Sequence, residues 1–196
     1  MPYQDPVDRS ELEDVMAVYG EAEVEEIEVD VDRNLFQNRF LKSAGRRGEV
    51  VFAIQMPDGI LVHHKSFYRD GVFRLLSGGI DYGEKVVDAL PREIEEETSL
   101  TLSSGRLLGV QDCQLVYENR AVRFASYVFY VHAAGDLHPD PKENITEFQT
   151  VSLTGLAAIA EDLRRAPAPH EGWGRWRALA HDLVYKRLMQ QSHNGD

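Results

Sequence analysis

Acidic side chains crowd one short stretch of this 196-residue chain. The letters "REIEEE", which begin at Arg92, place four glutamates beside a single arginine. Like charges three and four residues apart on a helix repel one another, so the stretch needs a compensating partner: water, a basic neighbour or a metal ion. Residues at those spacings share one helix face. The pattern therefore brings Glu93, Glu96 and Glu97 together and turns Glu95 elsewhere.

Three carboxylates on one helix face are suitable ligands for a hard divalent cation such as Mg²⁺ or Mn²⁺. A glycine-rich segment, "SGG" from Ser77, comes just before the predicted helix at 83–98, and glycine lets a backbone approach a ligand closely. A carboxylate face beside such a loop suits a metal-bridged diphosphate, in which the metal neutralises charge and activates water. The alternative explanation is a solvated acidic helix face without a ligand.

The segment 78–100 resembles the box of the Nudix hydrolase superfamily, G-x5-E-x7-R-E-U-x-E-E-x-G-U, in which U is a bulky aliphatic residue. Eight of the nine specified positions agree. Ser99 departs, because it stands where the family has the glycine that closes the helix in a left-handed turn, a change that costs about 1 kcal/mol. Leu76 and Ser77 replace the family's usual proline and glycine. Pro91 removes one backbone donor inside the helix, so we expect a kink or a break there.

Carried over position by position, the resemblance implies roles for the charged residues. The metal ligands, for Mg²⁺ or Mn²⁺, would be the three glutamates of the shared face and the backbone carbonyl of Ser77. Arg92 would orient the glutamates through charge-assisted hydrogen bonds. Glu84 would support that network from the start of the helix. One of the glutamates, or a carboxylate from a later loop, would accept the proton of the attacking water. For that later carboxylate we favour Glu147, just before the apparent last strand; the other candidates are Glu118 and Glu143.

Residues that contact substrate are less clearly marked. Tyr117 lies seventeen residues after Leu100, similar to a tyrosine of dinucleoside polyphosphate hydrolases, although a lone tyrosine on a strand more often serves packing. The resemblance to the family's glycine-rich loop also implies that Gly78 and Gly79 contact the substrate. Basic side chains either meet phosphates or are plain surface charges, and these are Arg46, Arg47, Lys65, Arg74 and Arg123, with Arg74 our choice for a substrate contact. His63 and His64 face opposite ways on a predicted strand and are interpreted as structural or solvent-facing.

The fold implied is a Nudix-type α/β/α sandwich with a central mixed sheet. Alternating patterns and turns independently predict a layered α/β domain. In the N-terminal helix, Ser10 and Glu13 form an expected capping box, and Gly20 is the expected stop. We expect three segments: a helix and strand arm at 1–44 that packs on the core or on a partner subunit, the Nudix hydrolase domain at 45–165, and a C-terminal helical extension of the same domain at 166–196.

Composition narrows the classes of partner. A net charge of −12 argues against general binding to nucleic acid or to a membrane surface, both of which need a basic footprint. No apolar run approaches the roughly 20 residues of a membrane span. The acidic first residues are unlike a signal peptide, and a single cysteine excludes an internal disulfide framework. We therefore expect a cytoplasmic protein with a small nucleotide substrate. The N-terminal arm resembles the one that builds homodimers in ADP-ribose and nucleotide-sugar pyrophosphatases.

Two main functional hypotheses follow from the resemblance. One is an Mg²⁺-dependent pyrophosphohydrolase that cleaves a phosphoanhydride in a nucleoside diphosphate linked to another moiety; the ADP-ribose or nucleotide-sugar type is favoured, and a dinucleoside polyphosphate is the second choice. The other is a non-catalytic Nudix-fold module that binds or senses a nucleotide. Isopentenyl diphosphate isomerase chemistry ranks third, because Cys113 has no suitable context.

Overall fold

The computed structural model describes residues 5–37 and 46–194. Its helices are α1 (Arg9–Tyr19), α2 (Arg33–Gln37), α4 (Val86–Thr98), α5 (Leu153–Arg164) and α6 (Glu171–Asn194), with a 3-10 turn η1 (Pro141–Glu143). Its strands are β1 (Val24–Asp30), β2 (Arg46–Met56), β3 (Gly59–Lys65), β4 (Leu76–Asp81), β5 (Thr101–Tyr117), β6 (Arg120–Ala134) and β7 (Ile145–Val151).

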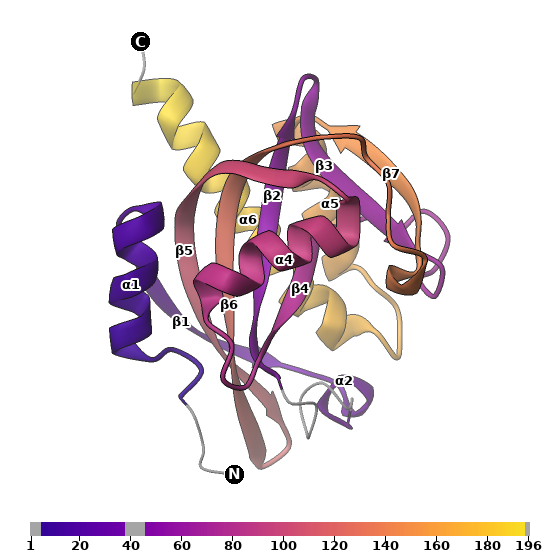
Figure 1. Cartoon of the computed structure of the whole chain (residues 1–196). Coiled ribbons are helices and arrows are strands. Elements are labelled where there is room, and N and C mark those ends of the chain that lie inside the picture. The colour runs from indigo at the N-terminus through magenta and orange to yellow at the C-terminus, as the bar shows by residue number, and fades with distance from the viewer. Residues whose placement is uncertain (1–4, 38–45, 195–196) are drawn as a thin grey trace.

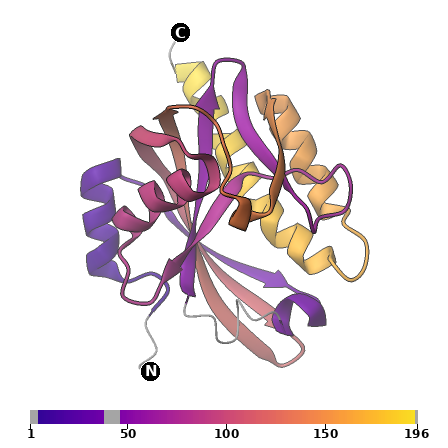
Figure 2. The ribbon, with the colours of Figure 1, turned by 45° about the vertical axis from the view of Figure 1, so that its right-hand side comes forward.

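The strands of the described segments form one seven-stranded sheet in the order β1-β5-β6-β2-β3-β7, and β4 adds to it by pairing with β2. The pairs β1–β5 and β2–β6 are parallel, whereas β5–β6, β2–β4 and β3–β7 are antiparallel. Helices α1 and α4 cover one face, and α5 and α6 cover the other (Figures 1 and 2). The predicted α/β/α sandwich with a central mixed sheet is confirmed.

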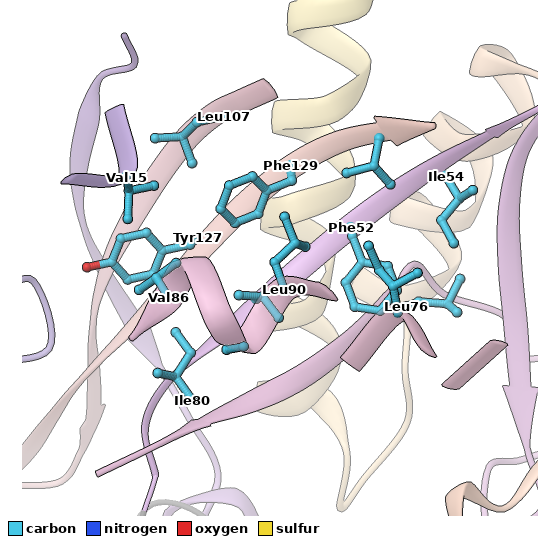
Figure 3. Close-up of a cluster of buried hydrophobic side chains, with 14 of the residues drawn as sticks. Val15, Phe52, Ile54, Leu76, Ile80, Val86, Leu90, Leu107, Tyr127 and Phe129 are labelled. Carbon is cyan, nitrogen blue, oxygen red and sulfur yellow. The ribbon is translucent and has the colours of Figure 1, made fainter. Parts of the chain in front are cut away.

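The packing of α4 on the sheet fixes the direction of its polar side chains. Val86, Leu90 and Ile94 recur every four residues and have no exposed surface. They lie in the same core cluster as Phe52 of β2 and Phe129 of β6 (Figure 3). Burying one such aliphatic side chain contributes about 1.5–3 kcal/mol. The helix therefore cannot roll about its axis without losing several kcal/mol of apolar burial.

Two features of α4 test the sequence analysis directly. The sequence predicts a kink or a break at Pro91; the helix runs from Val86 to Thr98 with Pro91 inside it, so a break is wrong. The reason is tertiary: buried Leu90 and Ile94 hold the turns on either side of the proline against the sheet. Ser99 follows in the left-handed conformation, with φ of 61°, and its N–H donates to the carbonyl of Glu95 at 2.7 Å. The left-handed C-terminal turn is confirmed, although no glycine is present.

The N-terminal helix begins differently from the prediction. Its N-cap is Asp8, whose carboxylate accepts a hydrogen bond from the backbone N–H of Glu11 at 2.9 Å. Ser10 lies inside the helix, so the predicted capping box is wrong by two residues. Because aspartate is as good an N-cap as serine, the pattern held two candidates and the structure uses the first. Gly20 ends α1 with φ of 89°, as expected.

Both terminal segments pack against the central domain. Val15 of α1 is fully buried in the core cluster that contains α4. Strand β1 pairs with β5 in the sheet, and Leu183 and Val184 of α6 are buried against the opposite face. The boundaries of the three segments, and a contact between the arm and a partner subunit, stay predictions. Within the described residues, no helix has the length and apolar character that crossing a bilayer requires.

Candidate active site

The glutamates of α4 are exposed to different degrees because of the roll of the helix. Glu93 and Glu97 sit next to the buried row formed by Leu90 and Ile94, and their exposed fractions are only 5% and 0%. Glu96 lies one step further round, and its side chain is 47% exposed. A three-residue step turns the helix by about 60° away from the core. The acidic face of α4 is therefore buried at Glu93 and Glu97 but exposed to solvent at Glu96, within little more than one turn of the helix.

Arg92 joins the more open part of this face. Its guanidinium donates to both oxygens of Glu84, from Nε at 2.7 Å and from Nη2 at 2.9 Å. Its Nη1 donates to Glu93 Oε1 at 2.8 Å and to Glu96 Oε2 at 2.9 Å. Nη2 also donates to the backbone carbonyl of Gly79 at 3.0 Å. The geometry therefore agrees with the orienting role implied for Arg92 and the supporting role implied for Glu84.

The same contacts shift the acidity of these groups. Burial acts to raise the pKa of Glu84, but the hydrogen bonds from Arg92 and from the backbone N–H of Asp81, together with the charges of Arg92 and Arg47, outweigh it, and the pKa is lowered. For Glu93 burial wins: it raises the pKa to about 7 despite the opposing Arg92. Hydrogen bonding to Glu84 raises the pKa of Arg92, which stays protonated throughout. Arg92 thus binds two carboxylates whose pKa values move in opposite directions: that of Glu84 is lowered, and that of Glu93 is raised by burial.

Gly78 is required by the position of Glu93. A Cβ built at Gly78 would lie 1.7 Å from Glu93 Cδ and 1.8 Å from Glu93 Oε2. Only a residue without a side chain lets the carboxylate rest on β4. Gly79 makes a second close approach, because its Cβ would meet the side chain of Arg46 at 2.3 Å. The predicted glycines therefore seat neighbouring charged groups, and their contact with substrate stays a prediction.

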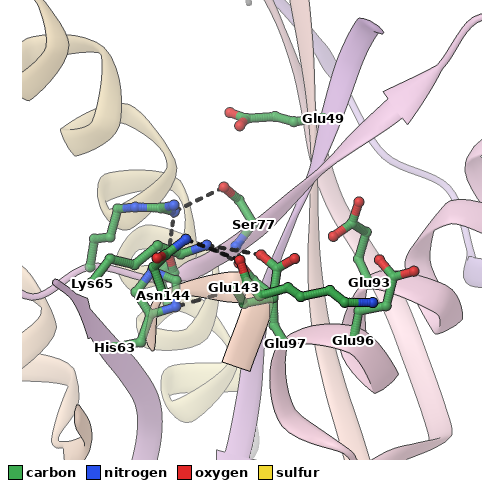
Figure 4. A network of polar contacts seen from close by, with 12 residues as sticks. Glu49, His63, Lys65, Ser77, Glu93, Glu96, Glu97, Glu143 and Asn144 are labelled. Carbon is green, nitrogen blue, oxygen red and sulfur yellow. Dashed lines mark hydrogen bonds and ion pairs between the residues drawn. The ribbon is translucent and has the colours of Figure 1, made fainter. Parts of the chain in front are cut away.

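Glu97 lies on the enclosed side of the face. Its Oε1 accepts a hydrogen bond from Lys65 Nζ at 2.8 Å, and its Oε2 accepts one from the backbone N–H of Ser77 at 3.1 Å (Figure 4). Burial raises the pKa of Glu97, although Lys65 and Arg74 oppose the shift. The carboxylate is thus held between strands β3 and β4 by one ammonium group and one backbone amide.

His63 also approaches Glu97. Its Nδ1 lies 4.0 Å from Glu97 Oε2, the side chain has no exposed surface, and neither ring nitrogen has a hydrogen-bond partner among the described residues. Burial, followed by the charge of Arg74, lowers the pKa of His63 well below its usual value. A neutral imidazole does not balance the charge of Glu97, so Lys65 is the main countercharge. The structural interpretation of His63 agrees with this placement.

The later carboxylate that approaches this face is Glu143, not the favoured Glu147. Glu143 Oε2 lies 3.2 Å from Lys65 Nζ (Figure 4). Glu147 is exposed, accepts a hydrogen bond from Gln149, and pairs across the ladder with His64. Directly paired residues project from the same face of a sheet, and His64 faces away from Lys65 because strand neighbours alternate. The structure therefore does not bring Glu147 to the glutamates.

Two other predicted substrate contacts lie elsewhere. Arg74 is 5% exposed, and its guanidinium donates to the Tyr68 hydroxyl at 2.6 Å, to the Leu75 carbonyl at 2.7 Å and to Ser77 Oγ at 2.9 Å. It braces the start of β4 and is not open to substrate. Tyr117 ends β5 at the hairpin tip, in a separate apolar cluster with its ring 5.7 Å from that of Phe36. Neither placement supports the predicted contact.

The site has the right groups for a hard cation but not yet in a metal-binding arrangement. Among the described residues, no three carboxylate, imidazole or thiol groups converge closely enough to hold a metal ion. The donor types nevertheless fit Mg²⁺ or Mn²⁺. The N–H and C=O of one strand residue lie on the same edge, and both the Ser77 N–H and the Gly79 carbonyl are bonded to α4. The Ser77 carbonyl therefore lies on the same edge of β4 as these two groups, and its role as a metal ligand stays a prediction.

Sequence reasoning missed how the basic residues are used. Lys65, Arg74 and Arg47 are 7%, 5% and 2% exposed and are not surface charges. Arg47 donates to Glu11 Oε1 at 2.5 Å, which ties α1 to the start of β2. Lys65 and His63 alternate with Leu61, which packs in the core cluster of α4. The sequence carries no signal for this placement, because both faces of the strand carry apolar residues.

Comparison with known proteins identifies the family of the central domain. Residues 45–172, more than half of the chain, match the family model of the NUDIX domain. The curated relatives include two proteins named NAD-capped RNA hydrolase NudC. The one from Edwardsiella ictaluri is 33% identical over 94 residues, which cover 48% of this chain and 35% of that protein. The one from Escherichia coli strain K12 is 29% identical over 94 residues, with the same coverage of 48% and 35%. The match thus spans about a third of the length of these two relatives.

Solved structures share the fold. A MutT NUDIX hydrolase from Burkholderia pseudomallei superimposes with a TM-score of 0.50 and 22% identity, covering 70% of this chain and 97% of that one. A NUDIX hydrolase from Nitrosomonas europaea gives a TM-score of 0.52 and 15% identity, covering 72% and 89%. At these identities the likeness concerns the fold alone. With the family model matched across its central domain, the chain belongs to the Nudix hydrolase superfamily.

Proposed function

We propose that this protein is a metal-dependent pyrophosphohydrolase that cleaves a phosphoanhydride in a nucleoside diphosphate linked to another moiety. The observation that carries the proposal is the arrangement of α4, where Arg92 binds Glu84, Glu93 and Glu96 together. Beside them, Glu97 lies against the N–H of Ser77. In a chain whose central domain matches the NUDIX family, this set of acidic side chains is best explained as a cation site.

The residues present would divide the work as follows. Glu93, Glu96 and Glu97, with the Ser77 carbonyl, would hold Mg²⁺ or Mn²⁺. When bound, such an ion supplies the positive charge that neutralises a diphosphate and polarises its phosphorus. Arg92 would fix the directions of its glutamates, since a fork of donors locks carboxylates more firmly than a single point charge. A carboxylate of the site would accept the proton of the attacking water.

We now propose Glu143, and not Glu147, as the later carboxylate that joins this site. Its side chain is 30% exposed, so it can reach both the solvent and the buried Lys65. The loop is anchored, because the carbonyl of Asn144 accepts a hydrogen bond from the N–H of Ser66 at 2.8 Å. Glu143 therefore has a defined place beside Glu97, which Glu147 lacks.

Three observations support a proposal for the substrate class: the names of the relatives, the position of Tyr117 and the net charge. The ADP-ribose and nucleotide-sugar types remain favoured, and NAD joins them because the NudC relatives are named for NAD-capped RNA. Dinucleoside polyphosphates rank lower, since Tyr117 lies at a hairpin tip in another cluster. The net charge of −12 favours a small nucleotide over a nucleic acid. A cytoplasmic location and a homodimer stay predictions.

The test is turnover of a substrate panel in the presence of Mg²⁺ or Mn²⁺. The panel contains ADP-ribose, nucleotide sugars, NAD, dinucleoside polyphosphates and an NAD-capped RNA, with products separated by chromatography. Glu97→Gln should abolish turnover of whichever substrate is cleaved. Glu95→Gln is the matched control, because Glu95 is an exposed glutamate on the same helix that points away. Equal losses in both variants would contradict the assignment.

A nucleotide-binding module without catalysis is the second candidate, and one observation favours it. Glu93, Glu96 and Glu97 each already form an ion pair with a protein cation, Glu97 with Lys65 and the other two with Arg92. A domain that only senses a nucleotide has no need of a metal there. Nucleotide binding measured by calorimetry, with no turnover of any panel member under either metal, would select this candidate.

A further inference from the structure

A lysine occupies the enclosed end of the glutamate face. Lys65 is 7% exposed, and its ammonium lies 2.8 Å from Glu97 Oε1 and 3.2 Å from Glu143 Oε2. It reaches them from the end of β3, whereas Glu97 belongs to α4 and Glu143 to η1. Three elements far apart in the sequence therefore meet at one ammonium group. Lysines are rarely buried unless they are paired, and here the pairing is with two carboxylates.

The other cations near the site serve different groups. The guanidinium of Arg74 donates hydrogen bonds to Tyr68, Leu75 and Ser77. It forms no hydrogen bond with Glu97. Arg92 binds the neighbouring glutamates of α4 from the open side. Of the lysines and arginines in the described part of the chain, Lys65 is the one that forms an ion pair with Glu97.

An external cation cannot reach Glu97 while Lys65 is in place. The Glu97 side chain is 1% exposed, and that of Lys65 is 9% exposed. One carboxylate oxygen faces the ammonium and the other faces the Ser77 N–H. A divalent ion at Glu97 would also lie within a few ångströms of the ammonium, and like charges at such distances repel strongly in a buried site. The two cations therefore exclude one another at this carboxylate.

From this geometry we propose that Lys65 is an internal cation that competes with the metal for Glu97 and Glu143 and so sets the metal affinity of the site. Resting on the proposed function, the inference adds a residue outside the family box to the metal site. In the metal-free protein, Lys65 holds both carboxylates and keeps them compensated. A divalent ion binds Glu97 only in the fraction of molecules from which the ammonium has withdrawn. The apparent affinity is reduced by that fraction.

The test compares Mn²⁺ binding, not activity, in three proteins. Lys65→Met keeps an unbranched side chain of similar length and removes the charge. Lys186→Met is the matched control, because it removes a lysine paired with Glu25 at 3.9 Å on α6, on the other face of the sheet. Mn²⁺ affinity is measured by electron paramagnetic resonance at about pH 8. If Lys65 is withdrawn in about a tenth of molecules, Lys65→Met binds Mn²⁺ about tenfold more tightly than wild type, and Lys186→Met binds as wild type does.

A second measurement needs no variant and covers the case in which Lys65→Met fails to fold. Wild-type protein is labelled with an amine-acylating reagent, and modification of Lys65 is followed by mass spectrometry. Mn²⁺ should increase the labelling rate of Lys65 and leave that of Lys186 unchanged, because displacement exposes the ammonium of Lys65.

The outcomes separate this inference from the proposed function. Equal or weaker Mn²⁺ binding by folded Lys65→Met, or unchanged labelling of Lys65, overturns the competition even if the wild-type protein hydrolyses its substrate. Absence of Mn²⁺ binding in all three proteins removes the metal site and the competition together. Tighter binding by Lys65→Met supports the competition even if no member of the substrate panel is cleaved.

Discussion

Arg92 carries more of the candidate site than any single glutamate. It makes five hydrogen bonds, to Glu84, Glu93, Glu96 and the carbonyl of Gly79. Three of these acceptors are carboxylates that would repel one another without it. Because the donors form a rigid planar fork, one side chain sets the direction of several acids at once.

Replacing this fork by a point charge should therefore damage the site while keeping its net charge. We expect Arg92→Lys to lower metal affinity or turnover about 10- to 100-fold, the usual effect of losing a residue that orients metal ligands. Arg165→Lys is the control, since the Arg165 side chain is 74% exposed at the end of α5. Steady-state kinetics and Mn²⁺ titration measure the effect. Arg92→Lys with wild-type values in both assays would show that charge alone is sufficient.

At the scale of elements, the C-terminal end of α4 combines a strained backbone at Ser99 with a hydrogen bond from the side chain of the same residue. Ser99 adopts φ of 61°, a conformation that costs a non-glycine residue about 1–2 kcal/mol. Its hydroxyl donates to the carbonyl of His138 at 2.6 Å, and a hydrogen bond of this kind contributes about 1 kcal/mol. The serine thus offsets the cost of its backbone with a contact that glycine would not make.

Two substitutions separate these contributions. Ser99→Ala keeps the strain and loses the hydrogen bond, so the free energy of unfolding should fall by about 1 kcal/mol. Ser99→Gly loses the hydrogen bond but relieves the strain, so its stability should stay within about 1 kcal/mol of wild type and exceed that of Ser99→Ala. Urea unfolding measures both. Equal stability of the two variants would mean that the left-handed backbone costs nothing here.

The sequence predicted elements well where the signal was local and less well where packing decided. Periodicity and the family box placed the glutamates of α4, and the left-handed turn at Ser99 was anticipated. The break at Pro91 was wrong, because the buried turns on either side outweigh one missing hydrogen bond. The choice of Glu147 over Glu143 failed for a similar reason: sequence distance to a strand does not show which strand face a side chain occupies.

At the scale of the whole molecule, the site is assembled by long-range contacts that no local pattern describes. Lys65, Ser77, Glu97 and Glu143 come from four elements. Their meeting depends on the isolated bridge between His63 of β3 and Arg74, two residues before β4, and on the pairing of β3 with β7. A family resemblance supplied the acids, but it carried no information on Lys65, which stands outside the box.

The far side of the sheet holds a group that makes stability depend on pH. His181 of α6 is 2% exposed. Its Nε2 accepts a hydrogen bond from the N–H of Leu75 at 3.0 Å, so its Nδ1 carries the proton and donates to the carbonyl of Arg177 at 2.8 Å. Protonating Nε2 would break the first of these bonds. Burial lowers the pKa of His181 to about 3.

Because proton binding and folding are linked, the lowered pKa of His181 makes the folded protein less stable as the pH falls. Between about pH 6.5, where an unfolded histidine titrates, and about pH 3, the unfolded chain binds a proton that the folded protein excludes. The contribution of His181 to stability is therefore complete above about pH 6.5 and is lost as the pH falls, by about 2 kcal/mol between pH 7 and pH 5. Buried His63 acts in the same direction, because its pKa is also lowered.

We therefore expect His181→Gln to reduce the loss of stability between pH 7 and pH 5 by about 2 kcal/mol relative to wild type. The variant also loses packing, so the informative quantity is the change with pH and not the stability at one pH. His170→Gln is the control, because His170 is exposed in the segment before α6. Urea unfolding of metal-free protein at both pH values measures the difference. If His181→Gln loses as much stability on acidification as wild type, then the imidazole is not the buried neutral group that joins α6 to the start of β4.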